Sequence, residues 1–79
     1  MEKEVVERFK NKKVLIYLKA SQGNYLVERY YCILAEIAGD TITCLDAKNR
    51  LMTFSISNIE NIMELSPRQL ETFDRIQKE

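Results

Sequence analysis

The sequence has 79 residues, the length of a single small domain, and we expect one domain over residues 1–79. Its 12 lysines and arginines balance its 12 aspartates and glutamates, so the net charge is zero and the strongly basic class of nucleic-acid-binding domains is disfavoured. Histidine is absent, which excludes a histidine metal ligand and a histidine general base.

The start of the sequence, MEKEVVERFK, is charged from its second residue and lacks the apolar core of a secretion signal. No apolar run approaches the ~18 residues that a membrane-spanning helix needs. We therefore expect a cytoplasmic protein with no membrane partner.

A short helix is predicted over residues 2–10, because its apolar side chains recur at helical spacing, with acidic residues early and lysines late. The stretch KVLIYLK then alternates between a strongly apolar face and a mixed face. This alternation predicts a first strand over residues 13–19. The turn-forming residues of ASQGN end that strand.

The second strand is predicted as one continuous bent strand over residues 25–37. Alternation places Cys32 and Leu34 on one face, and Tyr31 and Ile37 on the other. Both faces are partly apolar in the middle of the strand. A strand that exceeds the usual five or six residues and is covered on both sides usually bends, so that it serves two halves of a curved sheet.

Three shorter strands follow. A tight reversal at Gly39-Asp40 leads to a strand over residues 41–46, and a turn with Asn49 in the left-handed region leads to a strand over residues 51–57. A short helical turn at Ser57 and Asn58 precedes a fifth strand over residues 59–65.

The last element is a helix over residues 67–78. Ser66 is its expected cap, Pro67 its first residue and Gln69 the partner of Ser66 in a capping box. Its expected buried stripe consists of Leu70, Phe73 and Ile76.

Together these elements predict a mainly β fold. We expect a small, strongly bent, five-stranded antiparallel sheet that closes into a barrel of the Sm-like or SH3-like type, with an N-terminal and a C-terminal helix.

The element order resembles that of the Sm-like family, which includes Sm proteins and their archaeal and bacterial relatives. The resemblance spans roughly residues 2–65. It is carried by the short first helix, a basic pair before VLIYLK, the long second strand and the last two strands joined through ISNI. It implies a homo-oligomeric ring in which the fourth strand of one subunit pairs with the fifth strand of the next. On that basis the interface candidates are Met52, Phe54, Ile62 and Met63.

Sm-like proteins bind uridine-rich or adenosine-rich RNA at the loops between strands two and three and between strands four and five. The resemblance implies that the corresponding residues here are Asp40, Thr41, Ser57 and Asn58, and Tyr25 beside a turn is a further candidate for stacking on bases. The family's arginine-glycine pair in the second loop is replaced by Ser57-Asn58, which removes a strong hydrogen-bond donor.

We expect no enzyme, because no nucleophile has an evident base and two glycines provide no phosphate-cradling loop. Catalytic residues, metal ligands and cofactors are therefore not predicted. The leading hypothesis is a ring-forming protein that binds single-stranded RNA. One alternative is an SH3-like module that binds another protein and no nucleic acid. Another is a subunit whose C-terminal helix docks on a larger partner.

Several residues have both a structural and a functional interpretation. Cys32 and Cys44 are either two reduced buried thiols or a disulfide between neighbouring strands. Tyr17, Tyr30 and Tyr31 either pack in strands or stack on bases. The lysines of KNKK either contact phosphate or are solvated at the end of a helix.

Overall fold

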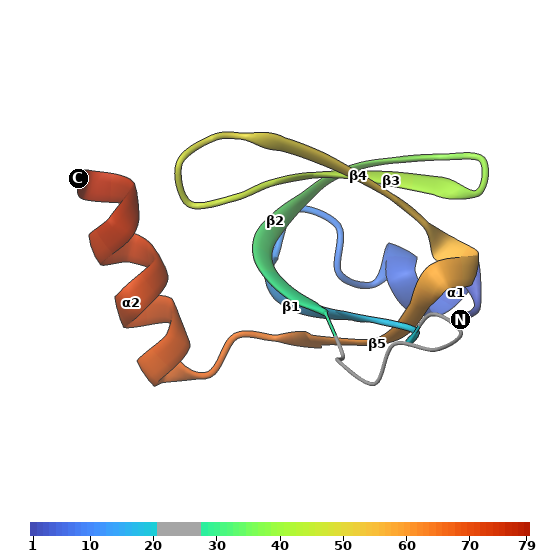
Figure 1. Ribbon diagram of the computed structural model, residues 1–79, viewed down its shortest axis with the longest axis horizontal. Coiled ribbons are helices and arrows are strands. Elements are labelled where there is room, and N and C mark those ends of the chain that lie inside the picture. Colours follow the sequence, from blue (N-terminus) through green and yellow to red (C-terminus); the bar gives the residue numbers. More distant parts are fainter. Residues whose placement is uncertain (21–27) are drawn as a thin grey trace.

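The structure is a computed structural model that describes residues 1–20 and 28–79. Those residues form α1 (Lys3–Glu7), β1 (Lys13–Leu18), β2 (Arg29–Ala38), β3 (Thr41–Leu45), β4 (Leu51–Ser55), the 3-10 helix η1 (Ile56–Asn58), β5 (Ile59–Glu64) and α2 (Pro67–Lys78). Figure 1 shows their arrangement, with α2 standing beside the sheet. The prediction of a mainly β fold with N-terminal and C-terminal helices is confirmed.

The described strands form one antiparallel five-stranded sheet in the order β4-β3-β2-β1-β5. Strong curvature of β2 bends this sheet around an apolar interior (Figure 1). Within the described strands β4 and β5 are the two ends of the sheet and pair with β3 and β1, not with each other. The predicted closure into a barrel is therefore wrong, because among the described residues each end strand has a pairing partner on one side only.

β2 is a single bent strand, as predicted, although the predicted residues 25–27 lie outside the described part of the chain. Its first half pairs with β1 and its second half with β3, and the latter pairing shifts by one residue between Leu34 and Glu36. This bulge turns Ile37 inward, where it lies opposite Ile42 and packs against the main core. The prediction that Ile37 shares a face with Tyr31 is therefore wrong.

The main core fills the inside of the curve. Its buried members are Val6, Val14, Ile16, Cys32, Leu34, Ile42, Cys44, Ile56, Ile59 and Ile62. Val6 comes from α1, so the short first helix contributes a fully buried side chain to this core. Ile59 and Ile62 both reach it from β5 although they are three residues apart, because the pairing of β5 with β1 shifts between Tyr17 and Leu18.

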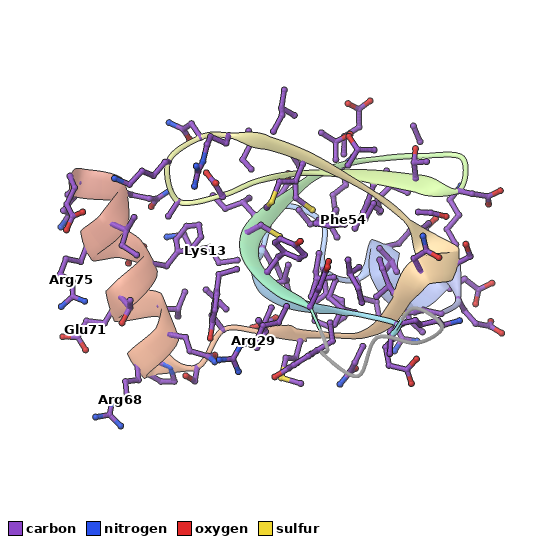
Figure 2. The ribbon with its side chains drawn as sticks, viewed as in Figure 1. Lys13, Arg29, Phe54, Arg68, Glu71 and Arg75 are labelled. Atoms are coloured by element: carbon purple, nitrogen blue, oxygen red, sulfur yellow. The ribbon has the colours of Figure 1, made fainter. Side chains whose placement is uncertain are left out.

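α2 covers a second, smaller apolar cluster on the opposite face of the sheet. Phe73 is 2% exposed and packs with Leu15 and Leu65. Lys13 Nζ lies 2.6 Å from Asp74 Oδ1 and 5.7 Å from the centre of the Phe73 ring, so this lysine sits between the sheet and the helix (Figure 2). The helix is thus joined to the domain by an apolar contact and an ion pair.

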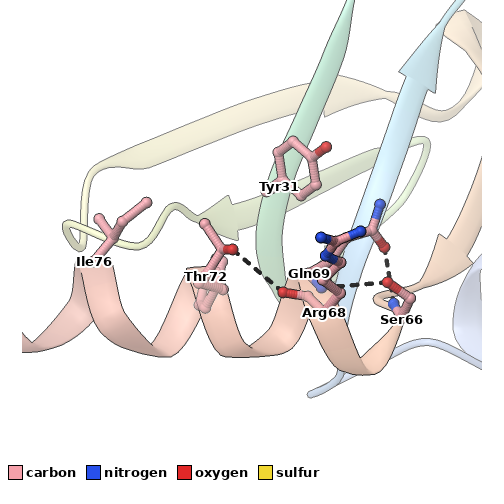
Figure 3. A pocket seen from close by; sticks show the side chains of 7 residues that line it. Tyr31, Ser66, Arg68, Gln69, Thr72 and Ile76 are labelled. Carbon is pink, nitrogen blue, oxygen red and sulfur yellow. Dashed lines mark hydrogen bonds between the residues drawn. The ribbon is translucent and has the colours of Figure 1, made fainter.

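The capping of α2 is as predicted. The Gln69 N–H donates to Ser66 Oγ at 3.2 Å, and the Ser66 N–H donates to Gln69 Oε1 at 2.8 Å (Figure 3). These bonds form a capping box, and Pro67 is the first helical residue. The predicted left-handed residue Asn49 has a φ of 60°.

Candidate functional site

The β2–β3 turn and η1 lie against each other. The Ile56 N–H donates a 2.7 Å hydrogen bond to the carbonyl oxygen of Asp40, and Thr41 pairs with Ser55 across β3 and β4. This contact gathers four residues predicted for nucleic-acid binding, Asp40, Thr41, Ser57 and Asn58, which we call the loop cluster. The fifth candidate, Tyr25, lies outside the described residues.

All four side chains of the loop cluster are exposed. Thr41 Oγ1 donates to the Ala38 carbonyl at 2.9 Å, and Ser57 Oγ lies 2.9 Å from Ser55 Oγ. The Asn58 carbonyl accepts a 2.8 Å bond from the Lys19 N–H, which fixes its backbone. The Asp40 carboxylate and the Asn58 amide make no side-chain hydrogen bond to another described residue, so these groups present acceptors and donors to solvent.

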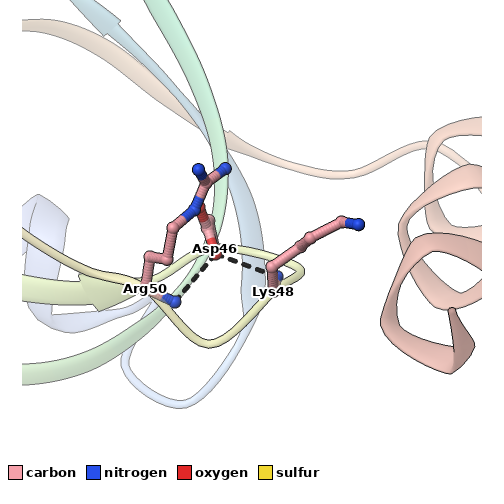
Figure 4. Close-up of polar contacts among 3 residues, drawn as sticks. All are labelled: Asp46, Lys48 and Arg50. Atoms are coloured by element: carbon pink, nitrogen blue, oxygen red, sulfur yellow. Dashed lines mark hydrogen bonds and ion pairs between the residues drawn. The ribbon is translucent and has the colours of Figure 1, made fainter.

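Several cations that the sequence offered for phosphate binding are held in ion pairs. Lys12 lies 2.8 Å from Glu64, and Lys13 is paired with Asp74. Arg50 Nε lies 2.7 Å from Asp46 Oδ2 in the β3–β4 turn (Figure 4). These contacts favour the structural interpretation of the basic residues over phosphate binding.

Asp46 organises the β3–β4 turn. Its Oδ1 accepts hydrogen bonds of 2.9 Å from the backbone N–H groups of Lys48 and Arg50 (Figure 4). The backbone N–H of Arg50, followed by its guanidinium and the Lys48 N–H, holds the pKa of the Asp46 carboxyl below its ordinary value of 3.8. The aspartate is therefore a structural residue of the turn.

The four residues predicted for the oligomer interface differ in exposure: some lie at the edge of the sheet and one lies in the core. Met63 on β5 is 39% exposed, while Met52 and Phe54 on β4 are partly buried. Ile62 is only 5% exposed and belongs to the main core. The sequence analysis missed Leu51 at the start of β4, which is 72% exposed; its apolar character at an outward position was the available signal.

The two cysteines are free thiols buried in the main core, which agrees with the first of their two interpretations. A hydrogen bond with Cys44 and burial raise the pKa of Cys32, so its thiol is not poised as a nucleophile. Among residues 1–20 and 28–79, no group of three or more carboxylate and thiol side chains is placed to hold a metal ion.

A groove of about 540 Å³ lies between α2 and Tyr31 of β2 (Figure 3). Sequence periodicity predicted the apolar stripe of α2, and Phe73 of that stripe is buried while Ile76 lines the groove. Periodicity within a helix does not indicate which strand that helix faces, so the groove itself was not predicted.

No helix in the described part of the chain is long and apolar enough to cross a membrane. Searches with family models, among curated proteins and among solved structures found no match to this sequence. The candidate sites therefore depend on the geometry of this chain alone.

Proposed function

We propose that this protein is a non-enzymatic, Sm-like subunit that assembles head to tail into a homo-oligomeric ring and binds single-stranded RNA at the loop cluster. The proposal rests mainly on the two end strands of the sheet and on the apolar side chains that they expose. Within the described part of the chain, β4 and β5 each pair on one side only, and each carries an exposed large apolar side chain, Leu51 and Met63. Unpaired apolar edge strands readily add another strand.

Pairing β4 of one subunit with β5 of the next joins two different surfaces. Such a contact is heterologous, and it leaves no free edge when the rotation between subunits closes into a ring. The same pairing covers Leu51 and Met63, together with the partly buried Met52 and Phe54 on β4. A domain of this size gains from such burial, because a 79-residue chain has a small core of its own.

The assembly is tested by light scattering coupled to size-exclusion chromatography. We expect a single species whose mass is a multiple of 9.3 kDa and corresponds to three or more subunits. Leu51→Asp or Met63→Asp places a charge in the edge pairing and should yield the monomer. Tyr31→Asp is the matched control, because Tyr31 is also 39% exposed but lies on the central strand β2, and this variant should keep the wild-type mass. A monomeric wild type would exclude the ring and favour the SH3-like alternative.

RNA binding is supported by the contact between the β2–β3 turn and η1, which brings the four residues of the loop cluster together. Its exposed Asp40 carboxylate and Asn58 amide are the kind of group that hydrogen-bonds to the edges of unstacked bases, and a ring would repeat them once per subunit. The loop cluster contains no cation among its four side chains, so we expect recognition through base edges and only a shallow dependence on salt.

Fluorescence anisotropy with labelled oligo-uridine and oligo-adenosine measures this binding. Asn58→Ala should weaken the affinity by roughly fivefold, which corresponds to the loss of about 1 kcal/mol from one hydrogen bond. Gln77→Ala, at an exposed position on α2, is the control and should bind as the wild type does. Equal affinities for Asn58→Ala and wild type, or no binding at low ionic strength, would remove RNA from the proposal and leave the assembly intact.

A further inference from the structure

The groove between α2 and β2 is a surface that neither the sheet edges nor the loop cluster uses. Its lining residues are Tyr31, Ser66, Arg68, Gln69, Thr72, Phe73 and Ile76. Its volume of about 540 Å³ lies within the range of pockets that hold small ligands or a few side chains of a peptide. Tyr31 is 39% exposed above the helix, so an aromatic face is available there (Figure 3).

The polar groups of the groove are largely committed to the helix itself. Ser66 and Gln69 bond each other in the capping box, and Thr72 Oγ1 donates to the Arg68 carbonyl at 3.2 Å. What remains accessible is apolar surface from Tyr31 and Ile76, together with the guanidinium of Arg68. The groove therefore presents an apolar floor with a charge at its rim.

Arg68 is the only charged residue among the described residues that line the groove, and it forms no ion pair with the described part of the chain. Its side chain extends from α2 away from the sheet, toward the same side as those of Glu71 and Arg75, so it borders the groove only at the outer rim (Figure 2). It lies in the first turn of a helix that has no acidic residue there, where a cation is electrostatically unfavourable. A carboxylate bound at this rim would pair with Arg68 and also meet the positive end of the helix.

We propose that this groove binds a peptide segment of another protein in which large apolar side chains are flanked by aspartate or glutamate. The apolar side chains occupy the space between Tyr31 and Ile76, and a flanking carboxylate pairs with Arg68. A single lining cation provides too little positive charge for a nucleic-acid track, which usually contacts several phosphates. Charge complementarity therefore favours the acidic peptide as the occupant.

The site is independent of the proposed ring. Its floor is the first half of β2, where Tyr31 pairs with Leu15 of β1, and its wall is α2, so neither element is one of the end strands β4 and β5. The peptide measurement is therefore made on both the wild type and the Met63→Asp variant. If both proteins bind the peptide, the inference about the groove holds whether or not the protein forms a ring.

The experiment uses two fluorescein-labelled peptides with the same Leu-Phe centre, flanked by two aspartates in one peptide and by two lysines in the other. Anisotropy at low ionic strength should show that the acidic peptide binds about tenfold more tightly, the effect of one charge-assisted contact. Added salt should reduce this preference. Ile76→Ser should weaken both peptides alike, because it removes apolar contact without changing charge.

Arg68→Glu should reverse the preference, so that the lysine peptide binds more tightly. Arg75→Glu is the matched control: it makes the same charge change on the same helix, but Arg75 does not line the groove, and the acidic preference should remain. Equal affinities for the two peptides, or an unchanged preference in Arg68→Glu, would overturn the inference. Displacement of the acidic peptide by oligo-uridine would overturn the choice of occupant, because it would identify the groove as a nucleic-acid surface.

Discussion

Asp46 shows how one side chain sets the shape of a turn. It accepts two backbone hydrogen bonds and a guanidinium contact within five residues, while Asn49 takes the left-handed conformation that closes the turn. The adjacent Ala47 packs against the cluster beneath α2. This carboxylate therefore supports both the β3–β4 hairpin and the surface on which the helix rests.

Replacing Asp46 by Asn should make stability less dependent on pH in the acidic range. The folded-state pKa of Asp46 is lowered, so its contribution is fully present above the ordinary value of 3.8 and is lost as the pH falls through the folded-state pKa. Urea midpoints of wild type and Asp46→Asn should therefore differ at pH 7 and converge toward pH 2. Glu36→Gln, at an exposed position outside the turn, is the control. A difference that stays constant with pH would contradict this role.

At the scale of elements, local patterns predicted the strands, the capping box and the short η1 turn, because alternation, helix caps and turn residues each act over a few neighbours. The face of Ile37 was mispredicted because the bulge in β2 changes the alternation, and its position depends on pairing with β3. The contact between Asp40 and Ile56 was not predicted, because it joins segments that are distant along the chain. The groove required the placement of α2 against β2, which no local pattern encodes.

α2 is expected to be part of the folded domain and not a free arm. Phe73 is almost fully buried against Leu15 and Leu65, so Phe73→Ala should cost about 3–5 kcal/mol of unfolding free energy. That is a large share of the roughly 5–15 kcal/mol typical of small domains. Urea denaturation at fixed protein concentration measures the change, and Ile76→Ala at the groove should cost less. A loss below about 1 kcal/mol for Phe73→Ala would indicate that the helix only rests on the sheet.

At the scale of the whole molecule, the candidate surfaces lie on different elements. In our proposals, assembly involves the outer sides of β4 and β5, RNA binding involves the β2–β3 turn with η1, and peptide binding involves α2 with β2. The termini lie on opposite sides of the molecule, with α1 beside the sheet interior and α2 outside it (Figure 1). The proposed edge pairing involves neither α2 nor β2, the two elements that line the groove.

Hydrogen–deuterium exchange of the wild type and Met63→Asp tests the proposed edge pairing most directly. If β4 and β5 pair between subunits, backbone amides in Leu51–Ser55 and Ile59–Glu64 exchange more slowly in the wild type than in the variant, while amides of β2 are equally protected in both. Exchange at β4 and β5 that is equally fast in the two proteins would contradict the account, because the edges would then be open to water in the native state.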